Sequence, residues 1–294
     1  MTEPMSRTIT EALPASAFSL LDNGAFRASS LTRGLWNPNH QHAGPCIALA
    51  CRGVEGVAKA HGLTHVARIT ANLLRPLPIG DFTLEVATDY AGRNVGHFSA
   101  RLEAGGKEVA RFTALVHREH DMPVPEGLPG HPLPSAPKSP DDSRPAVFPF
   151  DDRLLGYSDL VEVRVARGNF FNGPCAAWFR MRHPLLDGEA PSVYQRVAVI
   201  ADSGNGVSAV LDLERYSFTN SDLTINLLRR PVGEWICLDA RTYLGPGGCG
   251  HAESKIYDDQ GLIGRALQTL AVRPQASMDE QRPTPLNGSP QEAQ

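Results

Sequence analysis

Two stretches of the sequence carry residue types that could do chemistry on a bound molecule. In the first, His40 and His42 precede Gly44 and Pro45, just before a segment with helical spacing. Two histidines with one residue between them, near no Cys or acidic cluster, are weak support for a metal site, because zinc takes three or four protein ligands. Such histidines are more typical of a loop or a pocket wall. We therefore expect neither a metal nor a cofactor.

The second stretch is Gly245-Pro-Gly-Gly-Cys-Gly250, which is as rich in glycine as a phosphate-binding loop. A phosphate loop continues into Lys-Ser or Lys-Thr and then into a helix. Neither follows here, so we reject that interpretation and expect a bend between two strands. Cys249 within the stretch and Cys237 before it have no neighbouring base and are expected to be structural.

The composition excludes several classes of function. The chain has 294 residues, of which 41% are hydrophobic and 20% charged, which suits a globular protein of one large or two ordinary domains. Its formal net charge of -4 gives no reason to expect a nucleic-acid partner. No apolar run reaches the length of about eighteen residues that spans a membrane, so no membrane association is expected.

The cysteines and the first residues bear on the compartment. Five cysteines, an odd number with no CxxC pair, argue against a disulfide framework. The N-terminal residues, with Glu3 and Glu11 and no apolar run, do not resemble a signal peptide. A cytoplasmic location is therefore expected.

Hydrophobic spacing predicts one helix and several strands in the first half. Residues 47–60 place most apolar side chains on one face and are rich in Ala, which predicts a buried helix. Asp22-Asn-Gly24 is typical of a hairpin turn between two short strands. Short turns separate the later strand segments, which predicts an antiparallel meander. Those segments are 66–74, 81–90, 96–104 and 108–119.

The second half repeats this plan after a proline-rich segment. Residues 192–201 are the predicted helix, and Asp202-Ser-Gly-Asn-Gly206 after it is interpreted as a helix stop. The predicted strands are 159–167, 176–182, 209–228, 234–244, 250–257 and 263–273. We therefore predict an N-terminal domain at 1–120, a linker at 121–150, a C-terminal domain at 151–274 and a disordered tail at 275–294.

The two halves also share sequence. Asn72-Leu-Leu-Arg75 matches Asn226-Leu-Leu-Arg229, and Gly96-His97 matches Gly250-His251, both at an offset of 154. A fixed offset over such a length indicates an internal duplication, which makes two unrelated α+β domains the weaker alternative. An Ala-rich helix needs a sheet to cover it, and the sheet needs a helix on its concave face. We therefore predict an α+β tandem double hotdog, with two antiparallel sheets each wrapped around a central helix.

Four blocks carry a resemblance to a known family. They are Asn39-His-Gln-His-Ala-Gly-Pro45, residues 222–230, Ala240-Arg-Thr242, and Tyr257-Asp-Asp-Gln-Gly261 with Arg265-Ala-Leu-Gln268. These blocks resemble the double-hotdog acyl-CoA thioesterase family, which includes the bacterial acyl-CoA thioesterase II enzymes. The resemblance covers roughly residues 31–274. It implies hydrolysis of an acyl-CoA substrate to a free acid and CoA, and assembly into a homo-oligomer through the hotdog sheets.

The same resemblance implies a site of an Asp, a Thr or Ser, and a Gln around a water molecule. Carried over by motif, these residues are Asp222, Thr242 and Gln268, and a shift of one would replace Thr242 by Tyr243. A carboxylate can take the proton of the water while a hydroxyl and an amide hold it in place. A backbone N–H near Gly44, with His42 beside it, is the natural donor to the oxyanion, because the start of a helix favours negative charge.

The duplication provides an internal comparison for these candidates. Asp222, Thr242 and Gln268 align with Arg68, Asp89 and Ala114 of the first half, so only the second half carries the set. A polar set found in one copy favours a site, although each residue could also be an ordinary turn, strand or core residue.

The family usually has His directly after the Asp, where this chain has Leu223. Two alternatives therefore remain: a non-catalytic acyl-thioester-binding protein with a decayed site, and an enoyl-CoA hydratase-like enzyme.

Overall fold

The N-terminal half forms a hairpin, a long helix and four long strands. The computed structural model describes residues 11–149 and 154–275. The elements are β1 (Phe18–Leu20), β2 (Phe26–Ala28), a 3-10 turn (Ser30–Thr32), α1 (Ala43–Ala60), β3 (His65–Leu73), β4 (Asp81–Ala91), β5 (Val95–Ala104) and β6 (Lys107–His117). Helix α1 starts at Ala43, before the predicted start at residue 47, because the His42 side chain accepts a hydrogen bond from the backbone N–H of Gly44 and caps the first turn.

The C-terminal half repeats the order of helix and long strands. Its elements are β7 (Arg144–Ala146), α2 (Tyr157–Leu160), β8 (Val161–Gly168), β9 (Cys175–Met181), α3 (Val193–Ala201), α4 (Gly204–Val207), β10 (Tyr216–Asn220), β11 (Asp222–Leu227), β12 (Ile236–Leu244), β13 (Cys249–Asp258) and β14 (Gly261–Pro274). The strand predicted at 209–228 is shorter than expected. It begins at Tyr216 and is interrupted at Ser221, whose N–H donates to the carbonyl of Thr269.

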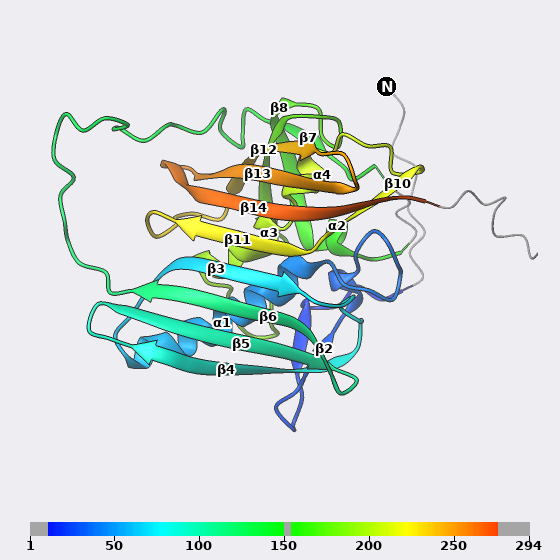
Figure 1. Ribbon diagram of the computed structural model, residues 1–294, viewed down its shortest axis with the longest axis horizontal. Coiled ribbons are helices and arrows are strands. Elements are labelled where there is room, and N and C mark those ends of the chain that lie inside the picture. The colour runs from blue at the N-terminus through cyan, green and yellow to red at the C-terminus, as the bar shows by residue number, and fades with distance from the viewer. Residues whose placement is uncertain (1–10, 150–153, 276–294) are drawn as a thin grey trace, which may run out of the picture.

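The two predicted sheets are one continuous sheet, which corrects the expectation (Figure 1). The strand order is β1-β2-β4-β5-β6-β3-β11-β14-β13-β12-β9-β8-β7, with β10 also paired to β14. The halves join where β3 and β11 pair in antiparallel fashion. Thr70 and Thr224, which are 154 positions apart, are partners in that register, and their hydroxyl oxygens lie 3.1 Å apart. The order β4-β5-β6-β3 is thus reversed across the seam, as two copies related by a twofold rotation would be.

The predicted meander is correct only for three of the four strands in each half. Strand β3 pairs with β6 and not with β4, and β11 likewise pairs with β14. The segment between β3 and β4 contains Pro76 and Pro78. Proline has no N–H for a ladder, so this segment does not close a tight hairpin and the chain crosses to the far edge of the half-sheet.

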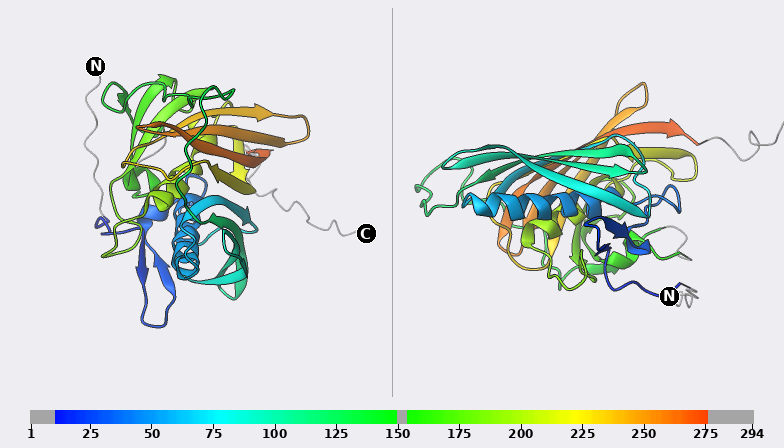
Figure 2. Two further views of the ribbon diagram at one scale, coloured as in Figure 1. Left: turned by 90° about the vertical axis from the view of Figure 1, so that its left-hand side faces the viewer. Right: turned by 90° about the horizontal axis from the view of Figure 1, so that it is seen from below.

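Helices α1 and α3 cover the concave face of the sheet and pack against each other (Figure 2). A Cβ added at Gly44 would lie 2.2 Å from the carbonyl oxygen of Val199, so only glycine lets the helices come this close. Buried residues from both halves form one hydrophobic core. The start of α1 is therefore fixed against the end of α3.

The proline-rich segment crosses the outer face of the C-terminal half. The indole N–H of Trp178 donates to the carbonyl of Lys138 at 2.6 Å. Leu133 and Ala136 pack against a second, smaller cluster of buried residues that contains Trp178, Cys237 and Tyr257. Strand β7 lies within the predicted linker and pairs with β8, so this half-sheet begins before residue 151. Of the predicted tail, only Gln275 falls within the described residues.

Candidate active site

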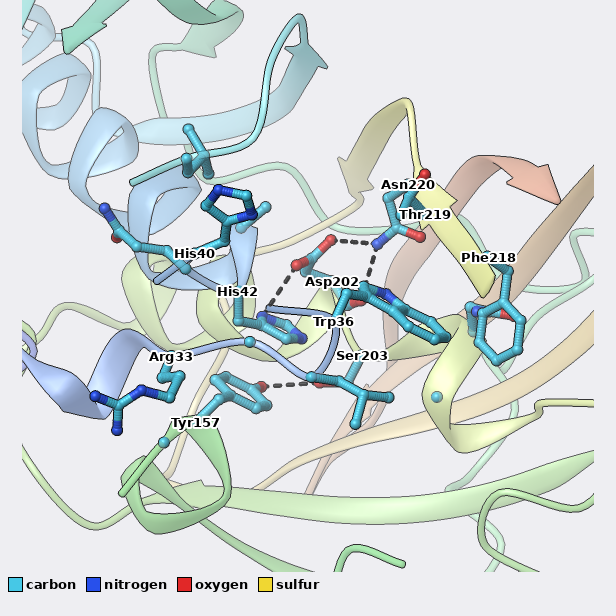
Figure 3. Close-up of a pocket in the computed structure, with 18 of the residues that line it drawn as sticks. Arg33, Trp36, His40, His42, Tyr157, Asp202, Ser203, Phe218, Thr219 and Asn220 are labelled. Carbon is cyan, nitrogen blue, oxygen red and sulfur yellow. Dashed lines mark hydrogen bonds and ion pairs between the residues drawn. The ribbon is translucent and has the colours of Figure 1, made fainter. Parts of the chain in front are cut away.

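A buried carboxylate, Asp202, lies where α1 meets the end of α3 (Figure 3). Its side chain is 2% exposed and receives hydrogen bonds from several elements. Oδ1 accepts from Asn220 Nδ2 at 2.7 Å and from Gln268 Nε2 at 3.2 Å. Oδ2 accepts from the Gly44 backbone N–H at 2.9 Å and lies 3.0 Å from His42 Nδ1. Donors of this kind, together with the positive end of a helix, stabilise the charged form of a carboxylate.

Local sequence explains how Asp202 reaches this position. It caps the C-terminus of α3, and the short helix α4 follows directly. A Cβ added at Gly204 would lie 2.8 Å from both Gln268 Oε1 and Ser254 Oγ. Glycine at this position therefore lets the chain turn tightly past β14, with the Asp202 side chain facing the start of α1.

His42 is held flat against Tyr157. The two rings stack with centroids 3.8 Å apart and an interplanar angle of 5°. Burial lowers the pKa of His42, although the nearby Asp202 acts in the opposite direction. Burial also raises the pKa of Tyr157, whose hydroxyl donates to the carbonyl of Val199. Both side chains are therefore neutral at neutral pH. His42 Nδ1 lies 3.2 Å from the Gly44 N–H and 3.0 Å from Asp202 Oδ2, so it accepts from Gly44 in one tautomer and donates to Asp202 in the other.

Gln268 contacts Asp202, as expected of the predicted functional amide, whereas the hydrogen bonds of Thr242 go to other residues. Gln268 is 1% exposed, its Nε2 donates to the carbonyl of Asp202 at 2.9 Å, and its Oε1 accepts from the N–H of Asn205 at 3.0 Å. Thr242 Oγ1 lies 2.8 Å from Ser208 Oγ and 3.3 Å from Asn205 Oδ1. Thr242 therefore supports α4 and is connected to Gln268 through Asn205.

The structure does not bring Asp222 to this cluster. Successive residues of β11 face opposite sides of the sheet, and Leu223 is fully buried on the inner side. Asp222 lies on the outer side, where its Oδ1 accepts from the backbone N–H of Thr269 at 2.7 Å. Tyr243, the alternative to Thr242, is also outside and is 41% exposed. Asp202 therefore replaces Asp222 in the candidate set.

Sequence reasoning missed Asp202 and Asn220. Asp202 was interpreted as part of a helix stop, yet an acidic residue directly after the apolar run Val197-Ala-Val-Ile-Ala201 is itself a signal for a buried carboxylate. Asn220 stands at the break between β10 and β11, and no sequence pattern distinguishes it from an ordinary turn residue.

A cavity of about 850 Å³ opens beside Asp202, His42 and Asn220. Both halves of the chain line it, and its lining residues include Trp36, Phe148, Tyr157, Phe170, Phe171 and Phe218. No group of three or more His, Cys, Asp or Glu side chains within residues 11–149 and 154–275 could hold a metal ion. Over the same residues, no helix is long and apolar enough to cross a membrane.

Two family models match the chain. Residues 32–117 match the acyl-CoA thioesterase N-terminal domain, and residues 131–272 match the acyl-CoA thioesterase C-terminal domain. The chain belongs to the acyl-CoA thioesterase family. The resemblance seen in the sequence is thus confirmed. Each half of this thioesterase family member corresponds to one domain of the family.

Solved structures of low sequence identity share the fold. A hot dog fold protein of unknown function from Alicyclobacillus acidocaldarius is 18% identical, with a TM-score of 0.66 over 90% of this chain and 97% of that one. A putative thioesterase II from Thermobifida fusca is 14% identical, with a TM-score of 0.65 over 88% and 96%. An acyl-CoA thioesterase II from Mycobacterium marinum is 16% identical, with a TM-score of 0.59 over 93% and 97%. A comparison with curated protein sequences finds no match.

Proposed function

We propose that this protein, built as two tandem hot dog units, hydrolyses an acyl-CoA to a free acid and CoA. The observation that carries the proposal is the buried Asp202 carboxylate, which lies on the cavity with Asn220 and Gln268 around it. The start of α1 faces the same carboxylate. A carboxylate, two amides and a helix N-terminus together can hold and deprotonate water without a metal.

In the proposed reaction, Asp202 accepts a proton from a water molecule as the water oxygen bonds to the thioester carbonyl carbon. Negative charge then develops on the carbonyl oxygen, and the Gly44 N–H at the helix start can stabilise it. The Gly44 N–H bonds to Asp202 in the structure, and protonation of Asp202 weakens that bond as the oxyanion forms. The C–S bond then breaks, and the proton passes from Asp202 to the departing CoA sulfur.

One observation favours a second candidate function. His42 and Asp202, which come from different halves of the chain, lie 3.0 Å apart. An Asp and a His together suit the addition of water to an enoyl thioester, which is hydratase chemistry. The two residues are far apart in the sequence, so only the folded chain brings this pair together. The family models favour hydrolysis, so hydration is the alternative outcome of the test.

The test uses the full-length protein with saturated and enoyl-CoA substrates. Release of free CoA thiol from saturated acyl-CoA supports hydrolysis. Loss of enoyl absorbance without thiol release supports hydration. Binding of acyl-CoA with neither change would contradict both enzymatic functions and support the non-catalytic acyl-thioester-binding alternative. Assembly into a homo-oligomer stays a prediction, which light scattering of the same preparation can check.

A further inference from the structure

The cavity beside Asp202 has two chemically different ends. Arg75 and Arg273 line the end beside β10, where Arg273 pairs with Ser217. Leu73, two residues before Arg75, donates its N–H to the carbonyl of Ser221 at the end of β10. Among the described residues neither guanidinium forms an ion pair with an acidic side chain, and that of Arg75 donates to the carbonyl of Glu108. Three phenylalanine rings line the other end: Phe148, Phe170 and Phe171. Phe148 contacts Tyr157, and Phe171 contacts α4. A substrate with an anionic head and an apolar acyl group can therefore lie with its head at the arginines and its acyl group at the rings.

Contacts of Asp202 connect it to both groups of side chains. Asn220, which bonds to Asp202, lies on β10 with Phe218, and Phe218 packs edge-on against Trp36. On the other side, Ser203 bonds to Tyr157, and the Tyr157 ring contacts Phe148 edge-on at 6.1 Å. In Figure 3, Tyr157 lies below and to the left of Asp202, and Phe218 lies to its right. The reacting carbonyl would then lie close to the ring cluster.

The three rings meet one another edge to face. Phe148 lies 5.4 Å from Phe170 and 6.0 Å from Phe171, centroid to centroid, and Phe170 lies 4.9 Å from Phe171 at an interplanar angle of 87°. Each side chain is only half-buried. The cluster therefore places edge-to-face rings in the cavity wall, an arrangement that a further aromatic ring can extend.

The backbone holds this cluster in place. Phe171 has a φ of 61°, in the left-handed region, where a bulky side chain is strained. Its ring lies against the backbone of Gly206 in α4, where an added Cβ would be 3.1 Å from Phe171 Cζ. Two features from separate elements, a strained aromatic residue and a facing glycine, thus fix one ring in the cavity wall. General hydrophobic packing would not require either feature.

We propose, resting on the thioesterase function above, that the preferred acyl group carries an aromatic ring close to the thioester, as in an arylacyl-CoA. A ring that enters the cluster gains edge-to-face contacts in addition to the burial of its apolar area. A linear alkyl chain of equal carbon number gains only the burial and loses more rotational freedom when it is ordered. The aromatic end therefore selects the acyl group.

The test compares three substrates with the same number of acyl carbons: phenylacetyl-CoA, cyclohexylacetyl-CoA and octanoyl-CoA. We expect kcat/KM for phenylacetyl-CoA to exceed the other two values by about three- to tenfold. The cyclohexyl compound separates ring electronics from ring shape. Equal rates for phenylacetyl and cyclohexylacetyl groups, or faster release from octanoyl-CoA, would overturn the proposal. No thiol release from any of the three would instead contradict the thioesterase function.

Variants locate the selection in the wall. Phe148→Leu and Phe170→Leu should each bring the phenylacetyl-to-octanoyl ratio towards one, while octanoyl turnover shows that the protein still folds. Phe218→Leu makes the matched change at the arginine end and should change kcat/KM for phenylacetyl-CoA and octanoyl-CoA by the same factor. A ratio that stays unchanged in both cluster variants would contradict the assignment of these rings.

Discussion

Two helix junctions in this molecule share one construction. At the first, Asp202 at the end of α3 accepts a hydrogen bond from the start of α1. At the second, Glu55 of α1 meets the start of α3, where its Oε2 accepts from Ser192 Oγ at 2.8 Å and from Gln195 Nε2 at 2.9 Å. Each junction thus places a carboxylate at the N-terminus of the other helix, although Asp202 and Glu55 are not at equivalent positions of the repeat.

The junctions differ in their donors and their openness. Asp202 accepts directly from the backbone N–H of Gly44, which also lies 3.2 Å from His42 Nδ1. At the second junction the N–H of Gln195 bonds to Ser192 Oγ, and Glu55 accepts from side chains instead. Asp202 lines the cavity, and Glu55 is not among the described residues that do. A carboxylate near a helix start is therefore common to both junctions, and an open cavity together with a direct bond from a backbone N–H makes one of the two a candidate site.

The largest expected effect separates the two carboxylates. Asp202→Asn keeps the shape of the side chain but cannot take the proton of water, so kcat for acyl-CoA hydrolysis should fall about 10²–10⁴-fold. Glu55→Gln is the matched change at the second junction and should leave kcat within about twofold, since Glu55 lies away from the cavity. Equal losses in both variants would remove the distinction between the junctions.

The close approach at the first junction can be broken with one methyl group. Gly44→Ala places Cβ 2.2 Å from the carbonyl oxygen of Val199. The helices must then separate, which should lower the free energy of unfolding by about 1–3 kcal/mol or more and reduce hydrolysis. In the same helix, nothing lies within 4 Å of a Cβ added at Gly56. Gly56→Ala should be neutral or stabilising by up to ~1 kcal/mol in denaturant unfolding.

The pH dependence of hydrolysis should reflect His42. Burial lowers its pKa from the ordinary value of 6.5, so the neutral ring persists into mild acid. Protonation of His42 would neutralise the charge of Asp202 and weaken it as a base, so the acid limb of kcat/KM should lie below pH 6.5. His42→Asn, which keeps a capping residue, should remove that limb. A limb at or above pH 6.5 that persists in the variant would contradict this role.

A change at the second junction should affect the stability of the protein and not its activity. Burial raises the pKa of Glu55 from its ordinary value of 4.5. The folded protein therefore holds this proton more tightly than the unfolded chain, and the related stability is present below pH 4.5 and lost as the pH rises through the raised pKa. As the pH rises above 4.5, the melting temperature of Glu55→Gln should fall less than that of the wild type. Identical pH profiles would exclude Glu55 as the source.

The smallest effect is expected at Asp222. Its carboxylate lies on the outer side of the sheet, away from the cavity. Asp222→Asn keeps an oxygen that can accept from the Thr269 N–H, so kcat should stay within about twofold. A loss as large as that of Asp202→Asn would restore Asp222 to the candidate set and remove Asp202 from its proposed role.

Much of the fold followed from pattern. The spacing of apolar residues predicted both long helices and most long strands, and the repeated Asn-Leu-Leu-Arg predicted the duplication. The pairing of β3 with β11, which joins the two half-sheets, could not be predicted. Both strands are rich in strand formers, and no sequence signal specifies which edge strands pair with each other. Gln268 was predicted from the family resemblance, and its position in an apolar strand agrees with it, because a buried amide needs partners.

By itself, the sequence determined the duplicated unit and the family, and it predicted two members of the candidate set, Gln268 and the Gly44 helix start. Only the tertiary structure decided which carboxylate belongs with them. Asp222 precedes a buried residue of β11, so the pleat turns it outward. Asp202 reaches Gly44, 158 positions away, because α3 packs end to start on α1. Side-chain direction and long-range packing are properties of the folded chain, and the choice of carboxylate depended on both.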